Sequence, residues 1–439
     1  MSAAPLAPSF ARQDVPPSAY FRRVDGVMTC DGVDLRELAE EVDTPTYVYA
    51  ARAIDDAFDA VRDAMKHASD REALVAYAIK ANGNLAILSR LAKRGCGADI
   101  VSGGELARAL EAGIAPHKIV FSGVGKRREE IELALEKDIR AIHVESAPEI
   151  RAIAAAAERR GTPARIALRV NPDVDAETHP YIATGLHGTK FGLELDVARE
   201  LLPEILGSPH LHLEGVACHI GSQLGTTEPL REAVGILARF AGEVRAAGAS
   251  RLRSLDVGGG WPMEYGCEAA PYPSYDDFGR AIRAGLNDAD AEDFDLITEP
   301  GRALVGSAGA LLTRVVFVKT PADRRFVIVD GAMTELIRPA LYEAYHAVVP
   351  VVVREGELRP ADVVGPVCES GDFLALDRKL PPIEAGDAIL LMGAGAYGRE
   401  MAMTYNARPP AAEVLVEDGA WKVVRKRASV ESLWALESY

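Results

Sequence analysis

Between about residue 70 and residue 310, short apolar runs alternate with longer amphipathic segments, and this rhythm constrains the fold more than any other feature. The longer segments, such as GELARALEAG and REEIELALEK, repeat apolar residues at a spacing of three to four, which is typical of helices. A regular succession of strand and helix predicts a parallel sheet. The expected strands are residues 75–79 (VAYAI), 98–101 (ADIV), 118–121 (KIVF), 141–144 (AIHV), 165–170 (RIALRV), 213–220 (LEGVACHI), 251–257 (RLRSLDV) and 295–299 (DLITE).

Eight strands within about 240 residues match the count and size of a (β/α)8 TIM-like barrel, with a doubly wound open sheet as the alternative. After residue 311 the apolar runs come closer together, divided by Pro, Gly and Asp, which predicts a second, mostly antiparallel β-barrel or sandwich domain. The expected domains are a mobile leader (1–20), N-terminal strands that join the β domain (21–45), the cofactor-binding barrel (46–310) and the C-terminal β domain (311–439).

The bulk composition excludes several classes of protein. The 439 residues carry a net charge of −16 that is spread along the chain, which argues against nucleic acid and anionic membrane as partners. No apolar run approaches the roughly 18 residues that span a bilayer, and the N-terminal segment lacks the pattern of a secretory signal. The 5 cysteines are scattered, without metal spacing, so we expect free thiols in a reducing cytoplasm.

Distinctive residues follow the carboxyl ends of four of the expected strands. Lys80 ends the first strand and His219 ends the sixth, while Gly258–Gly260 and Glu299–Arg302 follow the seventh and eighth. Each has an ordinary explanation alone, such as a lysine with its stem packed and its ammonium in water, or a tight turn at glycine. In a (β/α)8 barrel, however, the carboxyl ends of the strands carry the active site. The convergence on one rim therefore predicts a functional site.

These residue types together describe the chemistry of pyridoxal phosphate. Glycine amides after a strand bind phosphate, and a lysine in a partly apolar pocket forms a Schiff base. A carboxylate such as Glu299 keeps a pyridine nitrogen protonated, and an imidazole such as His219 stacks on a flat ring. A phosphosugar enzyme on the same barrel also needs lysine and glycines, so the residues alone leave that alternative open.

A set of longer motifs carries a resemblance to a known family. The chain resembles the fold-type III pyridoxal-phosphate decarboxylases, and within them most closely the diaminopimelate decarboxylases. The resemblance runs from residue 44 to residue 409. The matching stretches are TPTYVYA, YAIKANGN, GADIVSGGEL, FSGVGK, HPYIATGLHGTKFG, CHIGSQ, DVGGG, EPGR, LIRPALYEAYH, GPVCESGDFLA, GAGAYG and YNARP.

The resemblance implies a role for each matching residue. Lys80 would hold the cofactor covalently, with Asp99 supporting it, His219 against the ring and Glu299 at the pyridine nitrogen. Cys368 would donate the proton that replaces carbon dioxide. The phosphate end would be bound by Ser222, Gly258, Gly259, Gly260, Pro300, Gly301, Arg302 and Tyr397. The substrate would be bound by Arg302, Arg338, Tyr342, Glu369 and Tyr397.

The resemblance also implies an obligate homodimer, because Cys368 and Glu369 of one subunit would complete the barrel site of the other. The segment 178–191 matches the family's loop over the site. The implied reaction is decarboxylation of meso-2,6-diaminopimelate to L-lysine and carbon dioxide, the last step of lysine biosynthesis. A substrate with two carboxylates and two ammonium groups needs charges of both signs, which Arg302, Arg338 and Glu369 supply.

Two other activities and a non-catalytic role compete with this interpretation. Decarboxylation of ornithine, arginine or carboxynorspermidine would leave one of the paired arginines without a carboxylate. An amino-acid racemase should lack the EPGR, HIGSQ and CESGD stretches, and a non-catalytic relative should have lost the lysine or the cysteine. The sequence departs from the family pattern at Trp261-Pro262 and at Arg399-Glu400, which concerns the shape of the phosphate rim and the subunit contact.

Overall fold

The computed structural model describes residues 19–175, 190–321 and 324–438, which form two compact units. Of the described residues, the barrel unit comprises 54–175, 190–263 and 272–304, and the β unit comprises 19–53, 264–271, 305–321 and 324–438. Most of the predicted leader and most of the predicted loop at 178–191 lie outside the described residues. The predicted domain limits stay a prediction.

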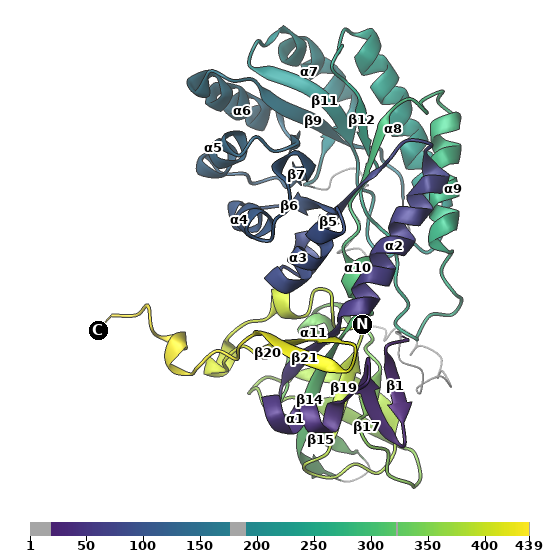
Figure 1. Ribbon diagram of the computed structural model, residues 1–439, viewed down its shortest axis with the longest axis vertical. Helices are drawn as coiled ribbons and strands as arrows, with labels where there is room; N and C mark the ends of the chain where they lie inside the picture. Colours follow the sequence, from purple (N-terminus) through teal and green to yellow (C-terminus); the bar gives the residue numbers. More distant parts are fainter. Residues whose placement is uncertain (1–18, 176–189, 322–323, 439) are drawn as a thin grey trace, which may run out of the picture. The chain divides into compact units, whose positions relative to one another are not determined.

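The barrel unit is built on eight parallel strands, in the order β5-β6-β7-β8-β9-β11-β12-β13, and the pairing of β13 with β5 closes the ring. The predicted (β/α)8 barrel is therefore confirmed, and each expected strand overlaps an observed one (Figure 1). A short strand, β10 (Leu193–Glu194), pairs with the end of β9. The barrel strands are β5 (Leu74–Ala78), β6 (Gly97–Ile100), β7 (Ile119–Phe121), β8 (Ala141–Val144), β9 (Ala164–Asn171), β11 (Leu211–Ala217), β12 (Ser254–Asp256) and β13 (Asp295–Thr298).

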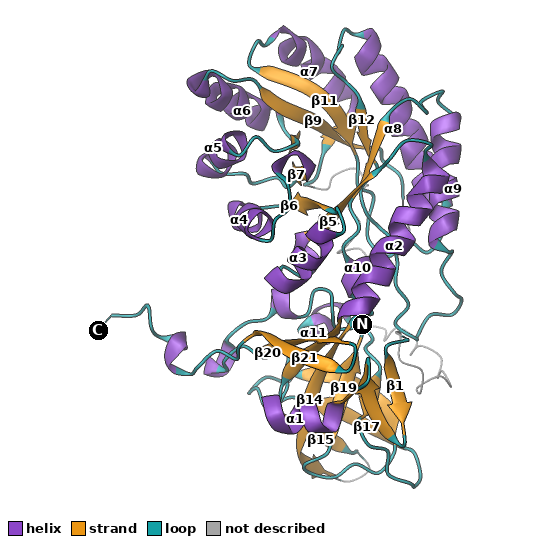
Figure 2. Cartoon of the chain, in the orientation of Figure 1, coloured by secondary structure: helices purple, strands orange, loops and turns teal. Residues whose placement is uncertain are grey.

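Helices follow the strands in sequence and lie outside the ring, as Figure 2 shows. Several begin at a side-chain cap, because a serine hydroxyl accepts a hydrogen bond from a backbone amide in the first turn. Ser102, Ser146 and Ser274 each cap a helix in this way. The helices are α2 (Ala51–Ala68), α3 (Leu85–Lys93), α4 (Gly103–Glu111), α5 (Arg128–Glu136), α6 (Ala147–Arg160), α7 (Leu195–Gly207), α8 (Glu228–Ala246), α9 (Tyr275–Asn287) and α10 (Arg302–Val305).

The β unit contains a mostly antiparallel sheet in the order β18-β17-β15-β14-β4-β20-β21, and β19 also pairs with β14 and β16. This arrangement confirms the predicted second β architecture. The central strand β14 pairs with β4, β15 and β19, and its first half is buried. The strands are β4 (Thr46–Ala50), β14 (Gly309–Lys319), β15 (Phe326–Val329), β16 (Val348–Pro350), β17 (Arg359–Val364), β18 (Phe373–Leu380), β19 (Ala388–Met392), β20 (Ala412–Glu417) and β21 (Ala420–Arg425).

The N-terminal segment joins this unit through a small sheet of β1 (Phe21–Val24), β2 (Val27–Cys30) and β3 (Val33–Asp34). The amide of Met28 donates to the carbonyl of Val351 at 2.8 Å. The segment also contains a helix, α1 (Leu35–Val42), which was not predicted from the sequence. The helix begins here because the Asp34 carboxylate caps its first turn. Among the described residues, no helix is both long enough and apolar enough to span a bilayer.

Candidate active site

Lys80 lies just past the carboxyl end of β5, in a single helical turn (Ile79–Ala81). The asparagines after it stabilise this sharp turn. Tyr77 Oη donates to the carbonyl of Asn82 at 2.9 Å, and the Asn84 side chain caps α3. The lysine side chain is 39 % exposed in a turn whose neighbours Ile79 and Ala81 are buried, so the amine is accessible from the rim.

The amine of Lys80 is paired with a buried carboxylate. Its Nζ lies 2.6 Å from Oδ2 of Asp99, which β6 holds in the barrel with no exposed surface. Burial alone would raise the pKa of Asp99, but the charge of Lys80 and its hydrogen bond outweigh burial and hold this pKa below its usual value. The predicted association of Lys80 with Asp99 is thus present as an ion pair.

His219 follows β11 and lies against the glycine loop that follows β12. The amide of Gly259 donates to Nδ1 of His219 at 3.1 Å, so the proton of the neutral imidazole lies on Nε2. Burial lowers the pKa of His219 to about 3, and the charges of Arg169 and Lys80 act in the same direction. The ring is therefore neutral at physiological pH, which suits packing against an aromatic cofactor.

The glycine loop approaches other backbone too closely for side chains. A Cβ on Gly258 would lie 2.4 Å from the carbonyl oxygen of Cys218, and one on Gly259 would lie 2.4 Å from that of Glu299. The amide of Gly258 donates to Asp256 Oδ1, so two of the three loop amides have acceptors inside the barrel. Among the described residues the amide of Gly260 has no such acceptor, which leaves it available to an anion.

Trp261, one of the departures from the family pattern, belongs to the support of this loop. Its Nε1 donates to Thr298 Oγ1 at 2.8 Å, and that hydroxyl donates to the carbonyl of Gly258 at 2.8 Å. The indole is buried and stacks on Phe278 with ring centroids 5.4 Å apart. The tryptophan therefore anchors the glycine loop to β13 and α9.

Glu299 follows β13 directly and lies in a buried polar cluster. Its Oε1 is 3.4 Å from Ser122 Oγ and 3.7 Å from His143 Nδ1, and His143 Nε2 is 3.8 Å from Asp256 Oδ2. Burial raises the pKa of Glu299 well above its usual value, and the nearby carboxylates of Asp256 and Asp99 raise it further. Because the charged form of this buried carboxyl group is costly, a cation beside it would stabilise that form.

The turn after Glu299 packs on the turn that bears Lys80. The amide of Ala78 donates to the carbonyl of Pro300 at 3.0 Å, and a Cβ on Gly301 would lie 3.2 Å from the Cβ atoms of Ala78 and Ala81. Arg302 then begins α10, and its Nη2 donates to Ser222 Oγ at 3.3 Å. The barrel unit thus brings all its predicted site residues to the carboxyl ends of the strands.

In the β unit, Cys368 and Glu369 lie on a tight turn whose backbone is well fixed. Asp372 accepts from the amide of Val367 at 2.7 Å and from that of Met333 at 2.6 Å. The amide of Cys368 donates to Asn406 Oδ1 at 2.9 Å. Both side chains at the top of this turn, Cys368 and Glu369, are exposed in the single chain.

Arg338 is buried at the start of the short helix α11 (Arg338–Tyr342). Its guanidinium lies over the ring of Tyr265, 5.0 Å from the centroid, and its Nη1 is 2.9 Å from His346 Nε2. His346 Nδ1 donates to the carbonyl of Met392, so Nε2 is the acceptor for the arginine. The charge of Arg338 is therefore held by aromatic rings, while Tyr342 is half-buried at the end of the same helix.

Tyr397 lies in the glycine-rich loop after β19 with a φ of 55°, a conformation that side chains rarely adopt. Two residues earlier the chain must have a glycine, because a Cβ on Gly395 would lie 1.9 Å from the carbonyl oxygen of Val305. Arg399, the second departure, points inward to the buried Glu413, with Nε 3.9 Å from Oε1. The departure therefore stabilises the interior of the β unit.

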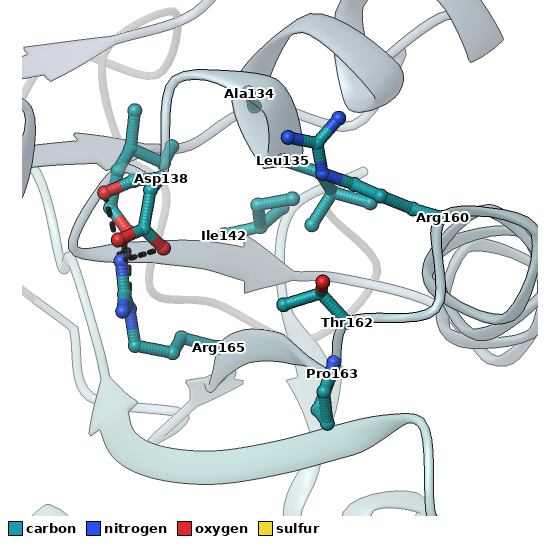
Figure 3. A pocket seen from close by; sticks show the side chains of 9 residues that line it. Ala134, Leu135, Asp138, Ile142, Arg160, Thr162, Pro163 and Arg165 are labelled. Atoms are coloured by element: carbon teal, nitrogen blue, oxygen red, sulfur yellow. Dashed lines mark hydrogen bonds and ion pairs between the residues drawn. The ribbon is translucent and has the colours of Figure 1, made fainter.

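Two cavities in the barrel unit lie at the opposite, amino-terminal ends of the strands. Figure 3 shows one of them beside α5, where Arg165 is bonded to Asp138. The other is lined by charged residues that precede or begin the strands, including Arg140 and Asp295. Neither contains a predicted site residue, so neither belongs to the candidate site.

The sequence interpretation missed the polar layer beneath Glu299, which consists of Ser122, His143 and Asp256. Signals for these residues are present: a histidine interrupts the apolar run AIHV, and an aspartate begins the DVGGG motif. Burial raises the pKa of Asp256 to about 7 and lowers that of His143 to about 3. The layer thus has perturbed ionisation, as functional sites often do.

The donor set of the barrel rim fits pyridoxal phosphate. Lys80 supplies an amine, and Glu299 a carboxyl group in a setting that favours a cation. The close packing at Gly258 and Gly259 shapes the loop that presents the amide of Gly260 to a phosphate, and Arg302 beside Ser222 adds positive charge. These features are what a cofactor with one aldehyde, one ring nitrogen and one phosphate requires.

Comparisons with known proteins agree with this donor set. Residues 52–306 match the family described as "Pyridoxal-dependent decarboxylase, pyridoxal binding domain". The diaminopimelate decarboxylase of Vibrio cholerae is 44 % identical over 423 residues, which cover 95 % of this chain and 99 % of that protein. The chain belongs to the diaminopimelate decarboxylases. The predicted family is thereby confirmed.

Solved diaminopimelate decarboxylases also share the fold. A crystal structure of the Helicobacter pylori enzyme complexed with L-lysine has a TM-score of 0.87 and 44 % identity, and covers 92 % of this chain and 99 % of its own. One of the M. jannaschii enzyme in co-complex with L-lysine has a TM-score of 0.91 and 37 % identity, over 97 % and 99 %. The decarboxylase family and the two-part fold therefore agree.

Proposed function

We propose that the protein decarboxylates meso-2,6-diaminopimelate to L-lysine and carbon dioxide, with pyridoxal 5'-phosphate as its cofactor. The observation that carries this proposal is the pairing of Lys80 with buried Asp99 beside Glu299, in a chain related over nearly its whole length to diaminopimelate decarboxylases. The reaction would be the last step of lysine biosynthesis.

The barrel residues bind and orient the cofactor in this proposal. Lys80 holds it covalently, and Asp99 positions the amine. His219, kept neutral and fixed by Gly259, lies against the ring, while Glu299 pairs with the pyridine nitrogen. When bound, pyridoxal phosphate supplies a ring that accepts the electrons released as carbon dioxide leaves. The phosphate is held by Ser222, Gly258, Gly259, Gly260, Pro300, Gly301, Arg302 and Tyr397.

The remaining residues handle the substrate. Arg302 and Arg338 bind its carboxylates, since the planar guanidinium matches a carboxylate in two hydrogen bonds. Glu369 binds an ammonium group, and Cys368 gives its thiol proton to the carbon that carbon dioxide leaves. Tyr342 and Tyr397 complete the set. The burial of Arg338 under Tyr265 supports this role, because a charge held away from water binds an opposite charge more strongly.

We also propose a homodimer in which Cys368 and Glu369 complete the barrel site of the partner subunit. The exposure of both side chains in the single chain supports this arrangement, because a proton donor in a decarboxylase needs shielding from water. A cytoplasmic location is proposed as well. The five cysteines are free, as expected in a reducing compartment.

Turnover with added pyridoxal phosphate tests the proposed reaction. Purified protein is given meso-diaminopimelate, L-ornithine or L-arginine in parallel, and both the amine product and carbon dioxide are measured. We expect lysine and equimolar carbon dioxide from diaminopimelate alone. Decarboxylation of ornithine or arginine at a comparable rate would leave the cofactor assignment intact and would contradict the roles of Arg302, Arg338 and Glu369.

A further inference from the structure

A buried polar layer lies beneath the proposed cofactor site, in the interior of the barrel. His143 on β8 and Asp256 on β12 are 1 % and 2 % exposed, and Glu299 follows β13. One ligand atom from each lies within 4.8 Å of the other two. Ser122, after β7, adds a hydroxyl 3.2 Å from His143 Nδ1 and 3.4 Å from Glu299 Oε1. Side chains from two separate pairs of adjacent strands, β7 with β8 and β12 with β13, thus meet inside the barrel.

The two nitrogens of this imidazole have different neighbours. Nδ1 faces Ser122 and Glu299, and Nε2 faces Asp256 Oδ2 at 3.8 Å. Burial lowers the pKa of His143 to about 3, so the ring is neutral and has one donor and one acceptor nitrogen. A neutral ring satisfies both neighbours only when one carboxyl group is protonated and the other is charged.

The protonation of the layer depends on what lies beside Glu299. In the protein alone, burial raises the pKa of both carboxyl groups, to about 7 for Asp256 and well above the usual value for Glu299. A protonated pyridine nitrogen next to Glu299 favours the opposite order, with the charge on Glu299 and the proton on Asp256. In that state the protonated Asp256 faces the lone pair of Nε2 at 3.8 Å, while Nδ1–H donates to Ser122 Oγ, whose hydroxyl donates to Glu299.

We propose that His143 is a positioning residue for Glu299: with Ser122 it holds this carboxyl group in place, and by presenting the lone pair of Nε2 to Asp256 it favours the state with the proton on Asp256 and the charge on Glu299. The proton is conserved, since it leaves the Glu299 carboxyl group and binds to that of Asp256. The inference rests on the proposed function, which assigns Glu299 to the pyridine nitrogen.

Three of the other charged groups around the layer are in ion pairs of their own. Asp99 is paired with Lys80 at 2.6 Å, Lys126 with Glu149 at 2.7 Å, and Arg169 with Glu145 at 3.0 Å. The charges that face His143 are Asp99, Lys126, Arg169, Arg140, Asp256 and Glu299. Asp256 and Glu299 also interact directly through a side-chain hydrogen bond, and the charge of Asp99 acts on both carboxyl groups. Replacement of His143 removes the imidazole and leaves these other groups present, so it tests the contribution of the ring.

The test uses the purified holoenzyme and two variants of opposite character. His143→Leu fills the space without polar atoms, whereas His143→Asn places an amide near the position of Nδ1, within reach of Ser122 and Glu299. The measured quantities are the affinity for pyridoxal phosphate and the pH at which the absorbance of the bound cofactor changes. His117→Leu, an exposed histidine of the same unit, is the matched control.

We expect His143→Leu to bind pyridoxal phosphate about 10-fold to 100-fold more weakly, the usual effect of losing a group that orients a binding residue. The pH midpoint of the cofactor absorbance should shift as well. His143→Asn should bind within about threefold of the wild type, and should retain most of the spectrum. The control should match the wild type in both measurements.

Several outcomes would overturn the inference. Equal affinity and an equal pH midpoint in His143→Leu and the wild type would show that the ring only fills space, as would better binding by Leu than by Asn. If the Leu variant fails to fold, Ser122→Ala is measured in its place. We expect this variant to bind pyridoxal phosphate more weakly than the wild type, by a smaller factor than expected for His143→Leu. Unchanged affinity and an unchanged pH midpoint in Ser122→Ala would contradict the role of His143. Stoichiometric bound zinc that a chelator removes would make the layer a metal site instead. A wild type that neither binds the cofactor nor decarboxylates would refute the proposed function rather than the role of His143.

Discussion

The barrel rim and the turn that bears Cys368 differ in how completely one chain builds them. At the rim, the amine of Lys80 has a carboxylate at 2.6 Å, and His219 is fixed by a backbone amide. On the turn, the backbone is held by Asp372, but the side chains of Cys368 and Glu369 are exposed to solvent. The rim is preorganised for a cofactor, whereas the turn has a fixed shape without an enclosed environment.

This contrast separates two kinds of requirement. Cofactor binding needs groups with perturbed ionisation, and the barrel perturbs them by burial, as for Glu299 and His219. Proton donation by a thiol needs protection from water, which a single chain does not give Cys368. Substitutions in the two regions should therefore fail in different ways, one through the loss of cofactor and the other through the loss of turnover.

The largest effect is expected for Lys80→Ala. Without the amine, the variant should lose both turnover and the covalent link to pyridoxal phosphate that borohydride reduction makes permanent. Mass spectrometry after reduction measures the link. Lys93→Ala, an exposed lysine on α3, is the control and should be labelled normally. Labelling of the Lys80 variant at another single lysine would show that the barrel rim has been assigned wrongly.

Cys368→Ala should leave the cofactor in place and slow turnover by about 10²-fold to 10⁴-fold, the usual contribution of a positioned proton donor. The absorbance of the bound cofactor and the rate of lysine formation are measured together. Cys267→Ala, a partly buried thiol elsewhere in the β unit, serves as the control. If Cys368→Ala lost the absorbance of the bound cofactor as well as its activity, the rim and the turn would not have separate roles in cofactor binding and turnover.

A smaller effect is expected on the pH dependence of stability. The pKa of Asp256 is raised from 3.8 to about 7 in the folded protein, so its stabilising contribution is complete below pH 3.8 and is lost as pH rises through about 7. Between about pH 5 and pH 8, Asp256→Asn should remove a decline on the order of 1 to 3 kcal/mol. Urea unfolding of the cofactor-free protein measures it, and parallel curves for variant and wild type would argue against a buried, protonated Asp256.

Much of the fold could be predicted from the sequence because it depends on local periodicity. The runs at 75–79 and 141–144 match β5 and β8 nearly residue for residue, since buried parallel strands are continuous apolar runs. The helix α1 was missed because its start depends on the single cap at Asp34 within a segment rich in turn residues. In such a segment, the local sequence pattern does not distinguish a short strand from a short helix.

The site was predictable where a motif marks a strand end, as at Lys80 and Glu299. The layer of Ser122, His143 and Asp256 was not, because its members are single polar residues that only the closed barrel brings together. The departures were also uninformative from sequence alone. Their roles became clear from Thr298 beneath Trp261 and from the buried Glu413 near Arg399.

The most direct test of the proposed division between the two regions is complementation between inactive chains. Lys80→Ala and Cys368→Ala subunits are mixed under conditions of subunit exchange, and lysine formation is measured. If each site combines a rim and a turn from different chains, half of the dimers are hybrids with one intact site of two, and activity should return to about a quarter of the wild type. A mixture of wild type with the doubly substituted chain is the control, since its hybrids should contain no intact site. Confirmed hybrids with no recovered activity would contradict the shared site.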